Sequence, residues 1–155
     1  QIDSHGNLNS TCIGDFESPK VRFPGSGGGN DFASLCWRTL VMTEHDPRRF
    51  VESLDFVTSP GFLDGPDARE CVGLPADTGP YRVITDLCVM GYSDREKRME
   101  VLSLHPGVSI DDVKSKTGFA VDASSELVET PPPTDQELDV LRHDVDPEKV
   151  VIGRE

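Results

Sequence analysis

The chain has 155 residues, a formal net charge of −13 and a hydrophobic content of 35%. This length fits one domain with a single core, and the strong negative charge makes nucleic acids and anionic membrane surfaces poor partners. No apolar run approaches the roughly 20 residues of a membrane span, and no signal-peptide pattern is present.

The first residues indicate a chain that is only part of a larger unit. It begins at Gln1 rather than methionine, and Gln1–Asp3 is typical of a strand that runs into a turn. The hydrophobic content is low, and 14 glycines with 12 prolines indicate much loop. We interpret the chain as a processed or truncated piece whose core is completed by an absent segment or a partner.

A glycine-rich loop over Pro24–Asp31 is the most informative motif. Glycines leave backbone N–H groups uncovered, so such a loop can bring amides up to an anion or a developing oxyanion. Asp31 or Asn30 is predicted to cap a short helix over Phe32–Cys36, whose N-terminal dipole would point at the same spot. A flexible linker is the alternative, which the flanking apolar residues disfavour. The residue sequence of this loop matches neither the glycine motif of dinucleotide-binding proteins nor a P-loop.

The next segments predict short strands, one helix start and a long loop. Leu40–Thr43 and Phe56–Ser59 are typical of strands. Asp46–Val51 is typical of a helix start, with Asp46 as the cap and proline at the first helical position. Residues 59–80 form a long irregular stretch, and its apolar residues favour an ordered, functional loop over a disordered one.

The second half of the chain predicts a β-hairpin and two capped helices. Tyr81–Met90 has the strongest strand pattern, Gly91–Lys97 a polar turn, and Arg98–Leu104 alternates polar and apolar residues. Ser109 begins a segment close to a capping box, and Thr134 begins a Thr-x-x-Glu capping box. Strands and helices therefore alternate, which predicts an α/β fold.

The cysteines and histidines give no sign of a metal site. The four cysteines form no Cys-x-x-Cys pair, so we expect reduced thiols and a cytoplasmic protein. A nucleophilic cysteine is the alternative, but no histidine stands at a revealing position. The histidines are dispersed, which favours structural or solvated roles. The residues concerned are Cys12, Cys36, Cys71, Cys88, His5, His45, His105 and His143.

A series of sequence motifs, given below in chain order, resembles the motifs of the β subunits of class I CoA-transferases. The similarity covers nearly the whole chain and weakens near Asp146-Pro147. The matching residues are Gln1-Ile2-Asp3, Gly6-Asn7, Asn9-Ser10-Thr11, Pro24–Asn30, Arg48-Arg49-Phe50, Asp55–Gly61, Asp64-Gly65-Pro66, Gly73-Leu74-Pro75 and Val83–Asp86.

The resemblance implies an open α/β sheet with flanking helices, in which residues 1–155 are the C-terminal part of a single β-subunit domain. It implies a hetero-oligomer with an α subunit, and coenzyme A or acyl-CoA as a substrate with no permanently bound cofactor. CoA would move to a short acid, such as glutaconate or a 3-oxo acid, by way of a glutamyl-CoA thioester. The glutamate would lie in the missing N-terminal segment, since no acid here matches its position. An acyl-CoA hydrolase or decarboxylase on the same scaffold is the alternative.

The resemblance also implies roles for the glycine loop. The backbone amides of Gly28 and Gly29, shaped by Gly27 and helped by Asn30, would stabilise the oxyanion that forms when a carboxylate attacks the thioester. Ser26 and the three glycines after it would contact the CoA thioester. The loop motif does not identify the acid.

Five further residues are weaker candidates. Asp64, Arg69 and Glu70 lie on the long loop, where Arg69 would pair with a free carboxylate of the substrate. An Arg/Asp pair that only pins the loop is the favoured alternative. Arg48 and Arg49 would contact the CoA phosphates, with solvated arginines at a helix start as an equal alternative.

Overall fold

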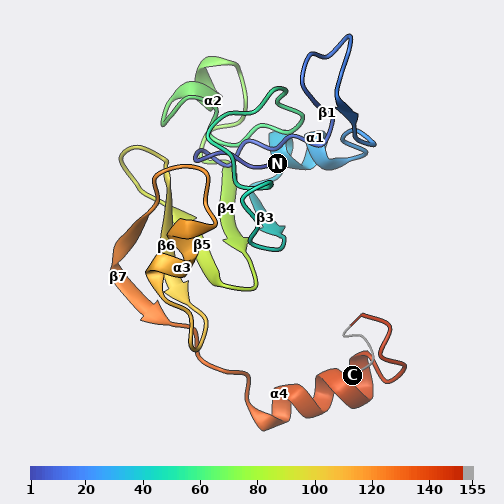
Figure 1. The fold of residues 1–155 in the computed structure, drawn as a ribbon, viewed down its shortest axis with the longest axis vertical. Helices are drawn as coiled ribbons and strands as arrows, with labels where there is room; N and C mark the ends of the chain where they lie inside the picture. Colours follow the sequence, from blue (N-terminus) through green and yellow to red (C-terminus); the bar gives the residue numbers. More distant parts are fainter. Residues whose placement is uncertain (152–155) are drawn as a thin grey trace.

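The computed structural model describes residues 1–151. Its centre is a five-stranded sheet in the order β3-β4-β5-β6-β7 (Figure 1). The antiparallel pairs are β4 with β5 and β5 with β6, whereas β3 is parallel to β4, and β7 is parallel to β6. The strands are β3 (Arg38–Met42), β4 (Gly79–Ile84), β5 (Cys88–Tyr92), β6 (Met99–Leu104) and β7 (Asp122–Glu129).

The remaining elements are short. Within residues 1–151 they comprise a two-stranded sheet and five helical segments. Figure 1 shows the last two helical segments standing apart from the sheet, beyond an extended stretch at residues 131–133. No helix in residues 1–151 is long and apolar enough to cross a membrane. These elements are β1 (Cys12–Ile13), β2 (Val21–Arg22), α1 (Gly29–Leu35), α2 (Ala68–Cys71), α3 (Ile110–Ser115), α4 (Asp135–Val140) and the π-helix η1 (Leu141–Val145).

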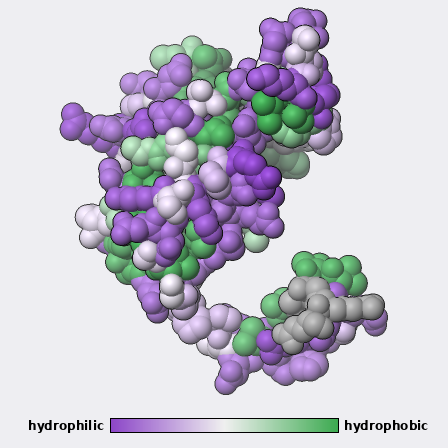
Figure 2. Space-filling view, in the orientation of Figure 1, coloured by the Kyte–Doolittle hydropathy of each residue, from purple (hydrophilic) through white to green (hydrophobic). Residues whose placement is uncertain are grey.

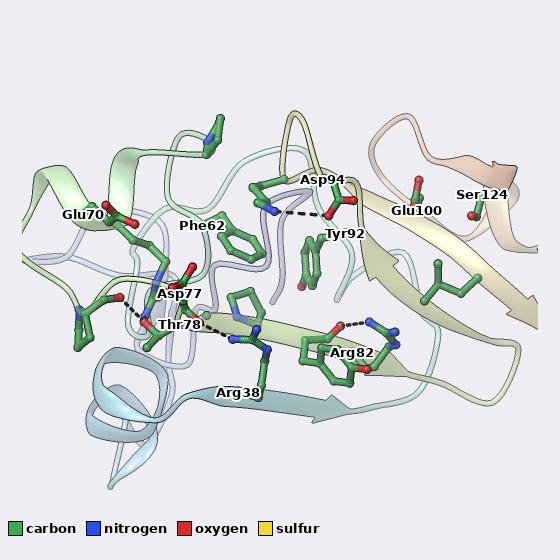
Figure 3. A pocket seen from close by; sticks show the side chains of 18 of the residues that line it. Arg38, Phe62, Glu70, Asp77, Thr78, Arg82, Tyr92, Asp94, Glu100 and Ser124 are labelled. Atoms are coloured by element: carbon green, nitrogen blue, oxygen red, sulfur yellow. Dashed lines mark hydrogen bonds and ion pairs between the residues drawn. The ribbon is translucent and has the colours of Figure 1, made fainter. Parts of the chain in front are cut away.

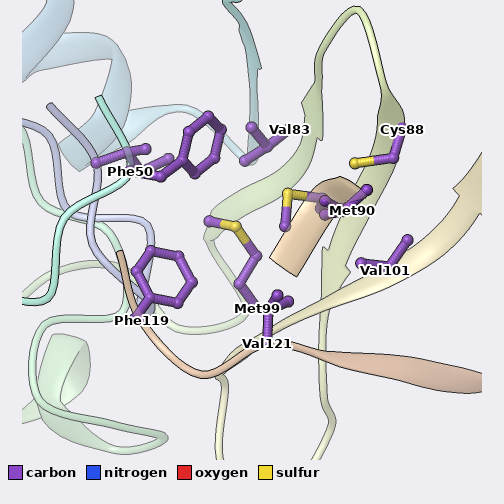
Figure 4. Packing of buried hydrophobic residues seen from close by; sticks show 10 residues of the cluster. Phe50, Val83, Cys88, Met90, Met99, Val101, Phe119 and Val121 are labelled. Carbon is purple, nitrogen blue, oxygen red and sulfur yellow. The ribbon is translucent and has the colours of Figure 1, made fainter. Parts of the chain in front are cut away.

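A cluster of buried apolar residues lies against the sheet (Figure 4). The face of the molecule seen in Figure 2 is covered largely by polar residues. Strand β6 buries every second residue, as its alternating sequence predicts. Phe50 and Phe119 come from loops and close the core, with ring centroids 6.5 Å apart. The buried cluster is Ile2, Phe50, Val83, Cys88, Met90, Met99, Val101, Val113, Phe119 and Val121.

Local signals predicted several elements correctly. Strands β5 and β6 form the expected antiparallel hairpin. Ser109 and Thr134 each cap a helix with a complete capping box, in which the side chain accepts the N3 amide and the N3 acid accepts the N-cap amide. All four cysteines are free thiols, as the spacing predicts. These features depend on a few neighbouring residues, which the sequence displays directly.

The prediction of one strand over Tyr81–Met90 was wrong, because the chain turns at Thr85 and forms both β4 and β5. The Thr85 hydroxyl oxygen accepts the amides of Leu87 and Cys88, each at 3.1 Å. Thr85 lies in a run with strong strand propensity, but its hydroxyl accepts backbone hydrogen bonds that stabilise a turn, so the strand ends there.

Other predicted boundaries were also wrong. Gln1–Asp3 and Phe56–Ser59 contribute isolated bridges rather than strands. Asp46–Val51 makes a single turn, because the Asp46 carboxylate accepts the Arg48 amide at 2.8 Å and no helix follows. Helix α1 begins at Gly29, ahead of Asn30 and Asp31, and has no side-chain cap. Strand β7 was missed because its polar sequence has little strand propensity, and pairing with β6 overrides it.

Candidate functional site

The glycine loop joins β2 to α1, and its shape requires glycine at two positions. Gly25 has a φ of +93° and Gly27 a φ of +50°, both in the left-handed region that side chains rarely adopt. Ser10 holds the start of the loop by two hydrogen bonds: its carbonyl accepts the Gly25 amide at 2.8 Å, and its hydroxyl donates to the Gly25 carbonyl at 2.9 Å. The loop is therefore an ordered turn and not a flexible linker.

The two amides predicted to form an oxyanion hole differ in their availability. The Gly29 N–H donates to the Ser26 carbonyl at 2.8 Å, so it already has a partner. The Gly28 N–H donates to no acceptor within residues 1–151. Asn30 donates its side-chain amide to the Thr58 carbonyl at 2.7 Å and thereby anchors α1. Of the two backbone amides predicted to bind the oxyanion, only that of Gly28 has no acceptor among the described residues, and its role remains a prediction.

The loop borders a hollow of about 730 Å³. Ser26 and Gly29 line it on the loop side, and Arg48 and Arg49 line it as well. The structure therefore brings the glycine loop and the arginine pair to one hollow, whereas the sequence analysis considered them as separate candidates. The other polar residues in its lining are Gln1, Asn9, Ser10, Thr43 and Ser59.

The two arginines are held by acidic neighbours but keep exposed surface. Arg48 pairs with Asp46 at 2.9 Å, and Arg49 pairs with Glu44 at 2.8 Å. The hydrogen bonds from Arg48 hold the pKa of the Asp46 carboxyl well below its usual range. Side-chain exposure is 88% for Arg48 and 46% for Arg49. Both arginines therefore line the hollow and stay accessible to solvent while paired with an acid.

The three candidates on the long loop do not join this hollow. Arg69 and Glu70 line a separate cavity of about 500 Å³, shown in Figure 3, and Asp64 lines neither. Arg69 is only 3% exposed. Its terminal nitrogens donate to the carbonyls of Gly61 at 2.8 Å and Ala33 at 3.0 Å and to the Thr78 hydroxyl at 2.9 Å. This geometry favours a structural role for Arg69, and substrate binding by the three residues remains a prediction.

Sequence reasoning missed the residues that support the glycine loop. Thr58 accepts from Asn30 through its carbonyl, and its hydroxyl oxygen accepts the Ser10 amide at 2.9 Å. Ser59 lies behind Gly29, where a Cβ on the glycine would be 3.6 Å from the serine hydroxyl. The signal was present in the matching run Asp55–Gly61, but without the fold nothing connected this run with a loop about 30 residues earlier.

A buried polar cluster lies just beyond the end of β3. The His45 ring stacks on Phe50 at 4.2 Å, and its nitrogens lie 3.2 Å from the Thr85 hydroxyl and 3.0 Å from the Thr117 hydroxyl. The Cys88 sulfur is 3.9 Å from the ring, but burial raises the pKa of this thiol to about 11. Both groups are therefore neutral near pH 7, so the cluster ties elements together and offers no thiolate nucleophile.

This cluster predicts a loss of stability in mild acid. Burial is the main cause that lowers the pKa of His45, and Lys116 adds to it while Asp86 opposes it. The unfolded chain takes up the proton below about pH 6.5, before the folded chain does, so the free energy of unfolding should fall as pH drops through this range. Denaturant titrations of the assembled protein at about pH 7.5 and 5.5, on either side of the histidine pKa, measure this fall. His45→Gln should remove most of the dependence, and an unchanged slope would contradict the assignment.

The model of the family described as "Coenzyme A transferase" matches residues 1–116. The chain belongs to this family. The corresponding subunit of glutaconate CoA-transferase from Acidaminococcus fermentans is 43% identical over 98% of this chain and 56% of its own length. That of 3-oxoadipate CoA-transferase from Pseudomonas knackmussii is 42% identical over 92% of this chain and 54% of its own. The cholesterol ring-cleaving hydrolase IpdB subunit of Mycobacterium tuberculosis is 32% identical over 97% and 59%.

The solved structure of the A. fermentans glutaconate coenzyme A-transferase superposes with a TM-score of 0.92, at 42% identity, and covers all of this chain and 59% of that one. The predicted family resemblance and α/β fold class are thereby confirmed. The chain spans little more than half the length of these CoA-transferase relatives.

Proposed function

We propose that this chain is part of the β subunit of a CoA-transferase that moves CoA from an acyl-CoA to a short dicarboxylic or 3-oxo acid. The observation that carries the proposal is a hollow bordered by the family's glycine loop and by two exposed arginines. The two relatives named as CoA-transferases are 43% and 42% identical to this chain, whereas the relative named as a hydrolase is 32% identical. Transfer is therefore favoured over hydrolysis or decarboxylation.

The glycine loop would act on the first chemical step. A carboxylate oxygen attacks the thioester carbonyl, and the carbonyl oxygen gains negative charge before the C–S bond breaks and the CoA thiolate leaves. A backbone N–H directed at that oxygen stabilises the charge as it forms, without any rearrangement of the protein. We assign this donor to the N–H of Gly28, which immediately precedes Gly29 of the hollow's lining. The attacking glutamate would belong to a segment outside this chain. Its attack gives an acyl-glutamyl anhydride, and the CoA thiolate then attacks the glutamyl carbonyl, which forms the glutamyl-CoA thioester and releases the first acid.

The proposal extends to the assembly. Residues 1–155 would be the C-terminal part of a single β-subunit domain, and the active site would be completed by the rest of that subunit and an α subunit. The complex would use CoA as a substrate, with no permanently bound cofactor, and would act in the cytoplasm. The relatives' designation as subunits and the free thiols support this assembly and location.

A CoA-exchange assay on the complete complex tests the reaction. Labelled acetyl-CoA is incubated with glutaconate or 3-oxoadipate, borohydride traps any glutamyl thioester, and mass spectrometry locates the product. Transfer of CoA to either acid, with an adduct on a glutamate outside residues 1–155, would support the proposal. Release of free CoA without transfer to either acid would replace it with hydrolysis. Release of CO₂ from the CoA ester of glutaconate, offered alone, would replace it with decarboxylation.

Arg49→Gln should weaken the use of acyl-CoA with little effect on turnover at saturation. An exposed charge contributes about 0.5–1 kcal/mol, so we expect the KM for acyl-CoA to rise by roughly two- to fivefold. The effect should shrink at high salt, because screening reduces exposed charge interactions. Steady-state kinetics at low and high ionic strength measure both changes. Arg95→Gln, which removes an exposed arginine from the turn after β5, is the matched control. Equal KM values for both variants would remove Arg49 from the CoA site.

A further inference from the structure

One buried serine in the lining of the glycine-loop hollow has a hydroxyl without a partner. Ser59 is only 3% exposed, and its hydroxyl makes no hydrogen bond with any of residues 1–151. Taking a hydroxyl out of water without a replacement hydrogen bond destabilises a folded chain, so such groups are rare and each needs an explanation. Because Ser59 lines the hollow, a bound substrate is a candidate for the missing partner.

The other polar side chains of this lining already have partners. The Ser10 hydroxyl donates to the Gly25 carbonyl at 2.9 Å, and Arg49 donates to the Thr43 hydroxyl at 2.6 Å. The lining residues with a side-chain hydrogen bond are Gln1, Asn9, Ser10, Ser26, Thr43, Arg48 and Arg49. Among the described residues, Ser59 is therefore the polar side chain of the lining that has none.

Two other buried side chains have an unpartnered polar atom, but a ligand cannot approach either. These atoms are the Nε of Arg69 and the hydroxyl of Tyr92, and both are enclosed by neighbouring protein atoms. The Tyr92 hydroxyl packs so closely against Gly6 that a Cβ on the glycine would clash with it. The position of Ser59 on a hollow distinguishes its hydroxyl from these two atoms.

The backbone of Ser59 is held beside the glycine loop. Its amide donates to the Leu8 carbonyl at 3.1 Å, and its carbonyl accepts the Leu8 amide at 2.9 Å. A Cβ on Gly29 would lie 3.6 Å from the Ser59 hydroxyl oxygen, and apart from the glycine's own chain neighbours and helix backbone no other described atom lies within 4 Å of that point. The hydroxyl therefore borders an open space beside Gly29.

The position of this hydroxyl compensates for the use of one loop amide. The Gly29 N–H donates to the Ser26 carbonyl at 2.8 Å, so of the two predicted amides only that of Gly28 has no acceptor among the described residues. Side-chain hydroxyls can stabilise an oxyanion in the same way as backbone amides. The Ser59 hydroxyl lies next to Gly29, where a second donor would be placed.

We infer that Ser59 is a catalytic residue that donates its hydroxyl to the thioester oxygen as negative charge forms there, alongside the N–H of Gly28. This inference rests on the proposed CoA-ester chemistry of the hollow. No side-chain base among the described residues is hydrogen-bonded to the hydroxyl, so Ser59 acts as a donor and not as a nucleophile.

Ser59→Ala in the complete complex should lower the turnover number by about 10²-fold and leave the KM for acyl-CoA nearly unchanged, because the charge on the oxygen forms only in the transition state. The melting temperature of the same complex should stay equal or rise, because alanine removes a buried hydroxyl that has no partner. Steady-state kinetics and thermal unfolding measure the two effects. A residue that only supported the glycine loop would lower the melting temperature when substituted.

Ser103→Ala is the matched control. Ser103 is also buried but lies in β6, away from the hollow, and its hydroxyl is 2.8 Å from that of Thr130. This variant should lower the melting temperature and keep the turnover number. A wild-type turnover number in Ser59→Ala, an equal loss in both variants, or a raised KM without a loss of turnover would overturn the inference alone. A wild-type complex that cleaves no CoA thioester would overturn the proposed function, and the role of Ser59 with it.

Discussion

Gly28→Val should lower the turnover number of the assembled enzyme by about 10²–10³-fold, the loss expected for one oxyanion donor. The Gly28 N–H has no acceptor among the described residues, and a branched side chain beside it would block the approach of a substrate oxygen. The backbone itself tolerates the change, because the φ of Gly28 is −84° and is open to any residue. Steady-state kinetics and chromatography of the complex measure turnover and assembly separately.

Gly28→Ala is the control for this variant. A Cβ at position 28 would lie 3.3 Å from the exposed Phe32 ring, which must move slightly for either substitution. Alanine makes this contact without the two methyl groups of valine and should keep most of the turnover. Wild-type turnover in Gly28→Val would sink the proposed oxyanion role. Equal losses in both variants would assign the effect to Phe32 instead.

Arg69→Met should cost about 3–5 kcal/mol of unfolding free energy, since it leaves several buried acceptors of one charged donor group without partners. Arg69 joins α1, through Ala33, to Gly61 and Thr78 of the long loop. Substitution of Arg69 by lysine should also destabilise the protein, because an ammonium group cannot reproduce the planar arrangement of donors of a guanidinium. Thermal and denaturant unfolding of the assembled protein measure the loss.

Arg82→Met is the matched control, because Arg82 lines the same cavity. Its guanidinium donates to the Tyr81 carbonyl at 2.8 Å and lies 3.9 Å from the Tyr81 ring. It should lose far less stability. If Arg69→Met kept its stability and instead lost discrimination between dicarboxylic and monocarboxylic acids, Arg69 would be a substrate ligand and the structural role would be wrong.

The sequence predicted the features that depend on short stretches of chain. Ser109 and Thr134 cap their helices because each box needs only a few neighbouring residues. The β5–β6 hairpin followed from alternation on either side of a polar turn. Strand β7 could not be predicted from local sequence, because its own residues have almost no preference for a strand and its pairing with β6 decides its conformation.

The candidate site was predictable as a set of motifs and not as an arrangement. The glycine loop was identified from its spelling, but the use of the Gly29 amide by Ser26 depends on the turn that the loop adopts. Arg69 was recognised as a candidate loop anchor, yet its acceptor at Ala33 is distant in sequence and belongs to α1. Sequence motifs therefore indicate the candidate residues, whereas contacts between distant parts of the chain determine which of these residues lie together.

The mixed sheet also orders the events of folding. Strands β4, β5 and β6 are joined by short turns, so their pairing closes small loops and costs little chain entropy. The parallel pairing of β3 with β4 must instead close the whole segment between Met42 and Gly79, which includes the long loop that Arg69 fastens. Non-local parallel contacts of this kind form slowly. We therefore expect β3, whose Val41 and Met42 line the glycine-loop hollow, to pair with β4 after the meander of β4, β5 and β6 has formed.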